Sequence, residues 1–167
     1  MPAAYISLGS NIEPERNLPL ALPALGRIGR VGQVSQVYES EAVGPPGQPA
    51  FLNAAVRIDL EEGQGQLLAR LRAVEAELGR VRTGDKFAPR TIDLDLVAME
   101  DYLDPDVATR AYLAATLAEI APHLRVGRDG EPIGSVAERL QRTTPLRIRP
   151  DVVLHASSGR SDPELNR

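Results

Sequence analysis

The order of apolar and polar residues along the chain predicts a sheet built from strands that alternate with helices. Four segments have the apolar runs or the two-residue alternation of strands, and they lie at 3–8, 33–39, 51–60 and 91–98. Leucines three or four positions apart predict helices at 14–28 and 64–79. Pro19 and Pro23 interrupt the first of these, so we expect that helix to start late or to be kinked.

The C-terminal part of the chain predicts a smaller helical region. Helical patterns at 107–121 and 135–141 precede an edge strand at 146–154. The βαββαβ order of the preceding part is that of the ferredoxin-like fold. We therefore expect an α+β protein with helices on one face of the sheet, followed by a short helical and β extension. Residues 1–155 are expected to form one domain and residues 156–167 a flexible tail.

Composition narrows the class of protein. The 167 residues are 43% hydrophobic and 25% charged, as in ordinary globular domains, and Cys is 0, which excludes disulfides and zinc-thiolate sites. A net charge of −4, 4% aromatic residues and Trp 0 disfavour a nucleic-acid-binding module. No stretch is apolar enough for a membrane span or a secretory signal, so we expect a cytoplasmic protein, taken to be a monomer without membrane or nucleic-acid partners.

Two carboxylates on one strand give the first candidate for chemistry. In TIDLDLV at 91–97 the apolar side chains share one face, so Asp93 and Asp95 share the other, about 6.5–7 Å apart along the strand. Parallel carboxylates repel each other unless a cation lies between them, and Mg²⁺ takes one or two carboxylates together with phosphate oxygens. On these residues alone, the solvated face of a half-buried strand remains an alternative.

A basic segment precedes this acid pair. Between positions 70 and 90 six basic side chains stand against three acidic ones, inside a chain of negative net charge. Arg82 and Arg90 flank a loop containing glycine and proline next to the carboxylates, which favours binding of phosphate oxygens. Arg70 and Arg72 are expected to form ordinary surface ion pairs with nearby acids. No GxxxxGK[ST] pattern occurs, so a P-loop is excluded.

Phe51 and Asn53 form a second candidate pair. They follow a rigid loop at 41–50 and lie two residues apart on one strand face. An aromatic ring can stack on a flat heterocycle, and an amide beside it can pair with the donors and acceptors of the heterocycle's edge. A core phenylalanine and a strand-edge asparagine are the alternative.

These segments together resemble the 6-hydroxymethyl-7,8-dihydropterin pyrophosphokinase family of folate biosynthesis. The resemblance rests on YISLGSN at 5–11, VSQVYES at 34–40, GPPGQPAFLN at 44–53, ELGRVR at 77–82 and PRTIDLD at 89–95, with IAP at 120–122 as a weaker match. It implies an enzyme that transfers pyrophosphate from MgATP to the pterin hydroxymethyl group and releases AMP, with ATP as co-substrate.

The resemblance also implies roles for individual residues. Asp93 and Asp95 would ligate two Mg²⁺ ions, and Arg82 and Arg90 would act on the triphosphate, which makes these four the implied catalytic set. The implied ATP-binding residues are Glu75, Arg80, Arg82, Arg90 and Arg110. The implied pterin-binding residues are Val43, Gly44, Phe51, Asn53 and Tyr112.

The chain departs from the family pattern at three places. Phe-Ala-Pro-Arg at 87–90 replaces Trp-Gly-Pro-Arg, and Glu41 and Ala42 stand where proline is typical. The segment 99–112 is shorter and lacks a histidine that helps to hold the nucleotide. The alternative function is therefore a catalytically impaired relative that acts as a pterin- or nucleotide-binding module.

Overall fold

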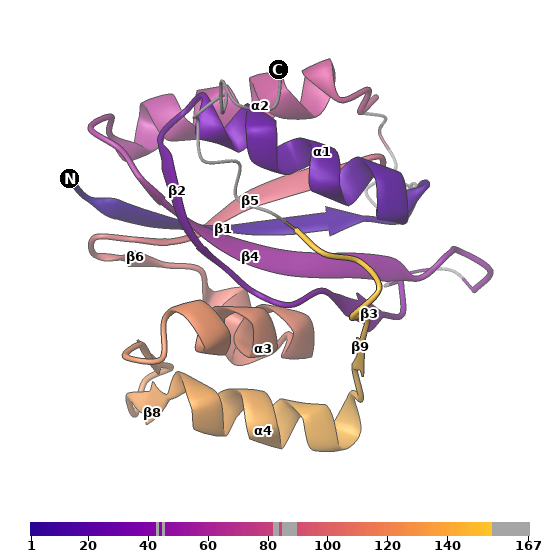
Figure 1. Cartoon of the computed structure of the whole chain (residues 1–167). Coiled ribbons are helices and arrows are strands. Elements are labelled where there is room, and N and C mark those ends of the chain that lie inside the picture. Colours follow the sequence, from indigo (N-terminus) through magenta and orange to yellow (C-terminus); the bar gives the residue numbers. More distant parts are fainter. Residues whose placement is uncertain (43, 45, 82–83, 85–89, 155–167) are drawn as a thin grey trace, which may run out of the picture.

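The computed structural model describes residues 1–42, 44, 46–81, 84 and 90–154 (Figure 1). The strands of the main sheet are β1 (Ala3–Ser10), β2 (Arg30–Val34), β3 (Tyr38–Ser40), β4 (Phe51–Asp59), β5 (Asp93–Met99), β6 (Tyr102–Leu103) and β9 (Arg147–Ile148). A separate hairpin pairs β7 (Arg125–Val126) with β8 (Glu131–Pro132). The helices are α1 (Pro14–Gly26), α2 (Gln64–Glu77), α3 (Ala111–Ile120) and α4 (Ile133–Thr143), with a 3-10 turn η1 (Pro105–Ala108).

The main sheet is antiparallel and has the order β6-β5-β1-β4-β3-β9, with β2 also paired to β4. The protein thus has a mixed α/β fold, with four helices and an antiparallel sheet among its described residues. Strand β1 lies between β4 and β5, and its register brings residues of all three strands into one row across the sheet. Gly9 pairs with Asn53 on one side and with Asp93 on the other.

One face of the sheet packs against α1 and α2, as Figure 1 shows. The alternation of side chains sends Ile6, Leu8 and Leu94 to this face, where they join the leucines of both helices in one apolar core. This agrees with the amphipathic patterns that predicted these two helices.

The opposite face carries α3, with α4 beneath it (Figure 1). Here Tyr5, Ala55 and Val97 of the sheet pack against α3 residues such as Leu117 in a second core. The expectation of helices on one face therefore holds only for α1 and α2. The C-terminal region is a second covering layer, because its helices carry enough apolar surface to bury part of the other face.

Local details differ from the predictions for physical reasons. Helix α1 begins at Pro14 and continues through Pro19 and Pro23, because its buried leucines outweigh the backbone bonds lost at the two prolines. The strand predicted at 33–39 is divided into β2 and β3. At the break, the Ser35 hydroxyl accepts the Ala55 N–H at 2.8 Å in place of a backbone carbonyl.

Other boundaries also shift. The helix predicted at 107–121 is divided between η1 and α3, and the edge strand predicted at 146–154 pairs only at β9. The predicted tail, 156–167, lies outside the described residues. In the part of the chain that is described, every helix is too short or too polar to cross a membrane.

The turn between α1 and β2 gives a test of this packing. A Cβ at Gly29 would lie 2.6 Å from the Asp59 carbonyl oxygen and from a methyl group of Ile58, whereas at Gly32 the nearest atom is 3.6 Å away. We expect Gly29→Ala to lower the free energy of unfolding by about 1–3 kcal/mol. The matched control Gly32→Ala should change it by less than about 0.5 kcal/mol. Urea unfolding of both variants measures this, and equal losses would contradict the packing described.

Candidate functional site

A cavity of about 320 Å³ opens on the same face of the sheet as α3, over the part of that face that α3 does not cover. Its floor comes from β1, β4 and β5, and its walls come from the loop before β4, from η1 and from the start of α3. The lining residues are Ser7, Gly9, Ser40, Glu41, Gln48, Phe51, Asn53, Arg90, Asp93, Asp95, Asp106, Arg110 and Tyr112. The cavity therefore brings together both pairs of residues that the sequence singled out.

The floor is shaped by Gly9, at the middle of the aligned row on β4, β1 and β5. A Cβ at this position would lie 3.5 Å from the Asn53 side-chain oxygen and 3.7 Å from the Phe51 ring. A side chain larger than hydrogen would occupy the space between the aromatic–amide pair and the acid pair. The glycine thus keeps the two halves of the cavity continuous.

Phe51, Asn53 and Tyr112 form the apolar and amide side of the cavity. Asn53 is buried, with 3% of its surface exposed, and its amide nitrogen donates to the Tyr38 carbonyl at 3.2 Å and to the Ser40 hydroxyl at 2.8 Å. These two acceptors fix the orientation of the amide. Tyr112 reaches the same cavity from α3, so two aromatic rings and one oriented amide line it. This arrangement suits a flat heterocycle with hydrogen-bonding edges.

The carboxylates of β5 form the charged side. Asp93 accepts hydrogen bonds from Arg80 at 2.8 Å and from Arg90 at 2.9 Å. Asp95 is half-exposed, and its nearest described cation is Arg72, at 3.6 Å. Burial against the cavity wall and the charge of Asp93 raise the pKa of Asp95 to about 6, although Arg72 opposes this rise. Arginines thus hold Asp93 closely, whereas Asp95 is less closely paired and still feels the repulsion of Asp93.

A divalent cation fits this donor set. Mg²⁺ is bound in proteins by one or two carboxylates together with phosphate oxygens and water. Among the described residues no group of three acids, histidines or cysteines gathers that could hold a metal by itself. Asp93 and Asp95 thus suit a cation that arrives with the oxygens of a phosphate-bearing ligand.

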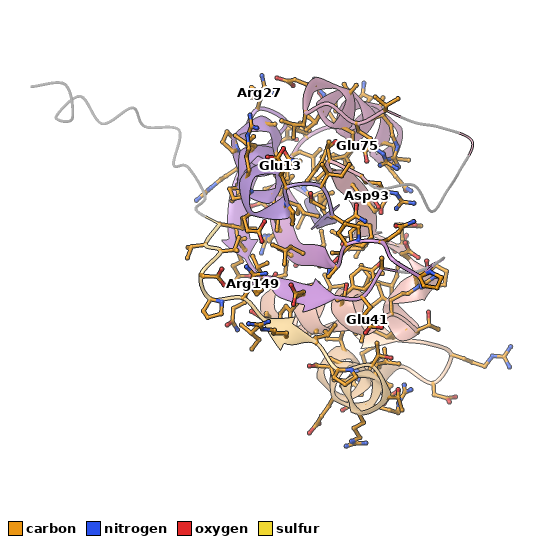
Figure 2. The ribbon with its side chains drawn as sticks, turned by 90° about the vertical axis from the view of Figure 1, so that its right-hand side faces the viewer. Glu13, Arg27, Glu41, Glu75, Asp93 and Arg149 are labelled. Carbon is orange, nitrogen blue, oxygen red and sulfur yellow. The ribbon has the colours of Figure 1, made fainter. Side chains whose placement is uncertain are left out.

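Glu75, on α2, supports the acid pair from outside the cavity. Only 2% of its side chain is exposed, and it accepts the Leu94 N–H at 3.1 Å and an Arg72 N–H at 2.6 Å. It is also hydrogen-bonded to Arg80, which in turn holds Asp93. Figure 2 labels Glu75 and Asp93 on the same side of the molecule. Glu75 and Arg80 therefore position the cavity's carboxylates without lining the cavity.

Arg70 and Arg72 both form ion pairs with nearby acids, as the sequence predicted. Arg70 pairs with Glu62 and Arg72 with Glu75. Arg72 has further contacts that were not predicted, because it also lies 3.6 Å from Asp95 and donates to the Leu94 carbonyl at 3.4 Å. The helical pattern places Arg72 on an exposed face, but it cannot show that this face adjoins the edge of β5.

Asn11 is a second residue whose role the sequence did not reveal. Its side-chain oxygen accepts the Arg90 N–H at 2.7 Å, its backbone N–H donates to the Arg90 carbonyl, and its amide donates to the Pro49 carbonyl at 3.4 Å. One buried residue at the end of β1 thus fixes two cavity walls. Its position in the YISLGSN segment, which carries part of the family resemblance, is the signal that the sequence offers.

The remaining predicted site residues are placed as follows. Arg110 immediately precedes α3 and lines the cavity beside Tyr112. Burial and the charges of Asp93, Asp95 and Asp106 raise the pKa of Tyr112, so its phenol is neutral at physiological pH. Gly44 adopts a φ of 119°, which favours glycine, and does not line the cavity. Val43 and Arg82 lie outside the described residues.

Several cavity residues have no role predicted from the sequence. They are Ser7, Gly9, Ser40, Glu41, Gln48 and Asp106. Glu41 and Asp106 lie in two of the segments that depart from the family pattern, and both add carboxylates to the cavity.

An acid pair held by arginines and continuous with an aromatic–amide slot indicates a transferase of the kinase class, acting on a flat heterocyclic acceptor. The family model for 7,8-dihydro-6-hydroxymethylpterin-pyrophosphokinase (HPPK) matches residues 5–122, and the chain belongs to this family.

Curated relatives agree with this assignment. A 2-amino-4-hydroxy-6-hydroxymethyldihydropteridine pyrophosphokinase of Synechocystis sp. is 33% identical over 166 residues, which cover 92% of this chain and 84% of the relative. The protein of that name from Pseudomonas aeruginosa is 37% identical over 134 residues, covering 73% of this chain and 82% of the relative.

Solved structures show the same fold. The HPPK-DHPS protein of Plasmodium falciparum with pteroate superposes with a TM-score of 0.62 at 10% identity, over 83% of this chain. A second HPPK-DHPS structure, in complex with substrates, gives 0.63 at 11% identity over 86% of this chain. This chain spans less than half of those longer chains, 44% and 46%.

The buried position of Glu75 predicts unequal roles for two arginines. Arg80, 11% exposed, is placed between Glu75 and Asp93, whereas Arg70 pairs with Glu62 on the surface. Arg80→Ala leaves a buried carboxylate with less compensation, so we expect a loss of about 3 kcal/mol in the free energy of unfolding. The matched control Arg70→Ala should lose less than about 1 kcal/mol. Denaturant unfolding distinguishes them, and a loss at Arg80 no larger than that at Arg70 would refute this role.

Proposed function

We propose that this chain transfers pyrophosphate from MgATP to the hydroxymethyl group of 6-hydroxymethyl-7,8-dihydropterin and releases AMP, as a step of folate biosynthesis. The observation that carries the proposal is the single cavity in which Phe51, Asn53 and Tyr112 meet Asp93 and Asp95. A transferase of this kind needs its acceptor and its phosphate donor in contact, and the two sides of the cavity provide for both. Family membership supports the same reaction.

The aromatic side of the cavity would bind the pterin. Phe51 and Tyr112 would stack on the two faces of the ring, and Asn53 would pair with its edge. The backbone at Val43 and Gly44 would read the same edge, as the family resemblance implies. Because the Asn53 nitrogen already donates to Tyr38 and Ser40, its side-chain oxygen is the atom best placed to accept a donor of the pterin.

The charged side would bind the nucleotide. Asp93 and Asp95 would hold Mg²⁺, two ions by the family resemblance, and these ions when bound supply charge neutralisation for the phosphate oxygens. Arg90 and Arg110 line the cavity and would bind phosphate oxygens directly, with Arg82 in the same role. Arg80 holds Asp93 and is supported by Glu75, so both contribute through the acid pair.

In the proposed reaction the pterin hydroxymethyl oxygen attacks the β-phosphorus of ATP, the bond from that phosphorus to the AMP oxygen breaks, and the hydroxyl proton is released to solvent. Transfer of phosphoryl-type groups depends mainly on positioning and electrostatic stabilisation. Arginines aimed at the phosphate oxygens would stabilise the charge that develops in the transition state. The oriented Asn53 amide and the two rings would hold the acceptor in line.

The topology supports the finer fold assignment as well. The order β5-β1-β4, with β2 and β3 beyond β4, is that expected of a split βαβ unit whose helices are α1 and α2. We therefore propose a ferredoxin-like core, to which the C-terminal layer of α3 and α4 is added.

The reaction class can be tested by identifying the nucleotide product. Purified protein mixed with MgATP and 6-hydroxymethyl-7,8-dihydropterin should form AMP only when the pterin is present, and chelation of Mg²⁺ should stop this. Chromatography resolves AMP from ADP. Formation of ADP would contradict pyrophosphoryl transfer. Pterin binding without either product would favour the alternative of a binding module.

The metal-binding role of Asp95 predicts a second outcome. Asp95→Ala should lower kcat by about 100-fold or more, the size of loss expected when one electrostatic contact to a developing charge is removed. Asp101→Ala, in the turn between β5 and β6, is the matched control and should retain activity. Steady-state kinetics at saturating MgATP measure both. Full activity of Asp95→Ala would show that this carboxylate does not hold the metal.

A further inference from the structure

Tyr38 and Glu119 link the sheet to α3 across the second core. Tyr38 lies on β3 with 8% of its surface exposed, and its phenol donates a hydrogen bond to one oxygen of Glu119. The other Glu119 oxygen accepts the Gln36 N–H at 3.1 Å. Both carboxylate oxygens are therefore engaged by the segment that leads into β3. Burial and Glu119 raise the pKa of Tyr38, so the phenol remains a proton donor.

The position of Glu119 has an energetic cost of its own. It is the last residue but one of α3, where the helix dipole disfavours a negative charge. A hydrogen bond to a charged acceptor is stronger than one between neutral groups and offsets that cost. A carboxylate at this position thus contributes little to the helix alone and acts through its two partners, Tyr38 on β3 and Gln36 just before it.

Helix geometry connects this link to the cavity. Tyr112 and Glu119 are seven residues apart, which places them on the same face of α3 and about 10 Å apart along its axis. The face that presents Tyr112 to the cavity is thus the one that Glu119 fastens to the sheet. A rotation of α3 about its axis would move both residues together.

Tyr38 also contacts the opposite wall of the slot. Its backbone carbonyl accepts the Asn53 amide at 3.2 Å, and the two residues are paired in register on β3 and β4. A single residue therefore orients the amide of the cavity through its backbone and fastens α3 through its side chain.

We propose that Tyr38 and Glu119 are positioning residues that set the spacing between Tyr112 and the Phe51–Asn53 wall, and with it the affinity for the heterocycle. This inference rests on the proposed function, because it takes the pterin to lie between these walls. Neither side chain lines the cavity, so neither is expected to contact a substrate. Their loss should weaken pterin binding and leave the nucleotide side, built on β5, largely unchanged.

The test uses a graded set of variants of the whole chain. Tyr38→Phe removes only the donor, and Glu119→Ala removes both acceptors. Glu119→Gln keeps an oxygen acceptor and should restore part of the effect. Tyr5→Phe is the matched control, since Tyr5 lies in the same core with 7% exposed and packs on His123. Calorimetry gives the Kd for 6-hydroxymethyl-7,8-dihydropterin with magnesium and a non-hydrolysable ATP analogue present, and kinetics give both KM values and kcat.

We expect Tyr38→Phe and Glu119→Ala to raise the Kd and the KM for the pterin about five- to tenfold. The KM for ATP should stay within about twofold, and Glu119→Gln should lie between Glu119→Ala and the wild type. Tyr5→Phe should leave all three values unchanged. If Glu119→Ala does not fold, Tyr38→Phe and Glu119→Gln still decide the matter.

The possible failures are distinguishable. If the wild-type protein binds the pterin and the variants bind it equally well, or lose only thermal stability, the positioning role is refuted and the proposed function stands. An equal loss for ATP and pterin would likewise refute a role specific to the slot. If the wild-type protein does not bind the pterin, the proposed function and this inference both fail.

Discussion

The register of β1 against its two neighbours is the constraint on which the rest of the site depends. Gly9 is paired at once with Asn53 of β4 and with Asp93 of β5, so one row across three strands carries the heterocycle side and the charged side of the cavity. Side chains alternate along a strand, so a slip of β5 by one residue against β1 would send the acids into the apolar core under α1 and α2. Leu94 and Leu96 of β5, which are buried in that core, oppose such a slip. The same residues that stabilise the fold therefore hold the functional row in place.

Helix α3 covers only part of one sheet face, and this leaves space for the cavity. Helix α3 buries Tyr5, Ala55 and Val97, and the polar positions farther along the same strands remain open as the cavity floor. Two carboxylates on that floor repel each other, and the protein limits the cost with arginines from outside the sheet. Glu75 is the centre of this arrangement because it is buried, caps the Leu94 N–H and holds both Arg72 and Arg80. An acid that does not line the cavity thus helps to organise the cations around the acids that do.

Short-range patterns were sufficient to predict the parts of the site that lie on single strands. Asp93 with Asp95, and Phe51 with Asn53, were predicted to share a strand face because strand periodicity requires it, and in the structure both pairs line the cavity. Contacts between distant segments cannot be predicted from such patterns. The helical position of Arg72 does not reveal that this side chain also reaches Asp95 on the neighbouring strand, and nothing local to Asn11 shows that it holds Arg90 and Pro49. Pro19 and Pro23 suggested a shortened helix, but the burial of Leu18 and Leu22 determines the outcome. The second layer was missed because helical periodicity does not say which face of a sheet a helix covers.

The central place of β1 also bears on how the chain folds. Its partners β4 and β5 follow much later in the sequence, and the pairing with β5 spans both α1 and α2. Contacts between such distant segments close large loops, and they slow folding relative to a protein built from local contacts. During synthesis, β1 leaves the ribosome before either partner, so its two edges stay unpaired until first β4 and then β5 have been made. The functional row is thus complete only after β5 has emerged, so a nascent chain that stops before Asp93 has a partial sheet and no acid pair.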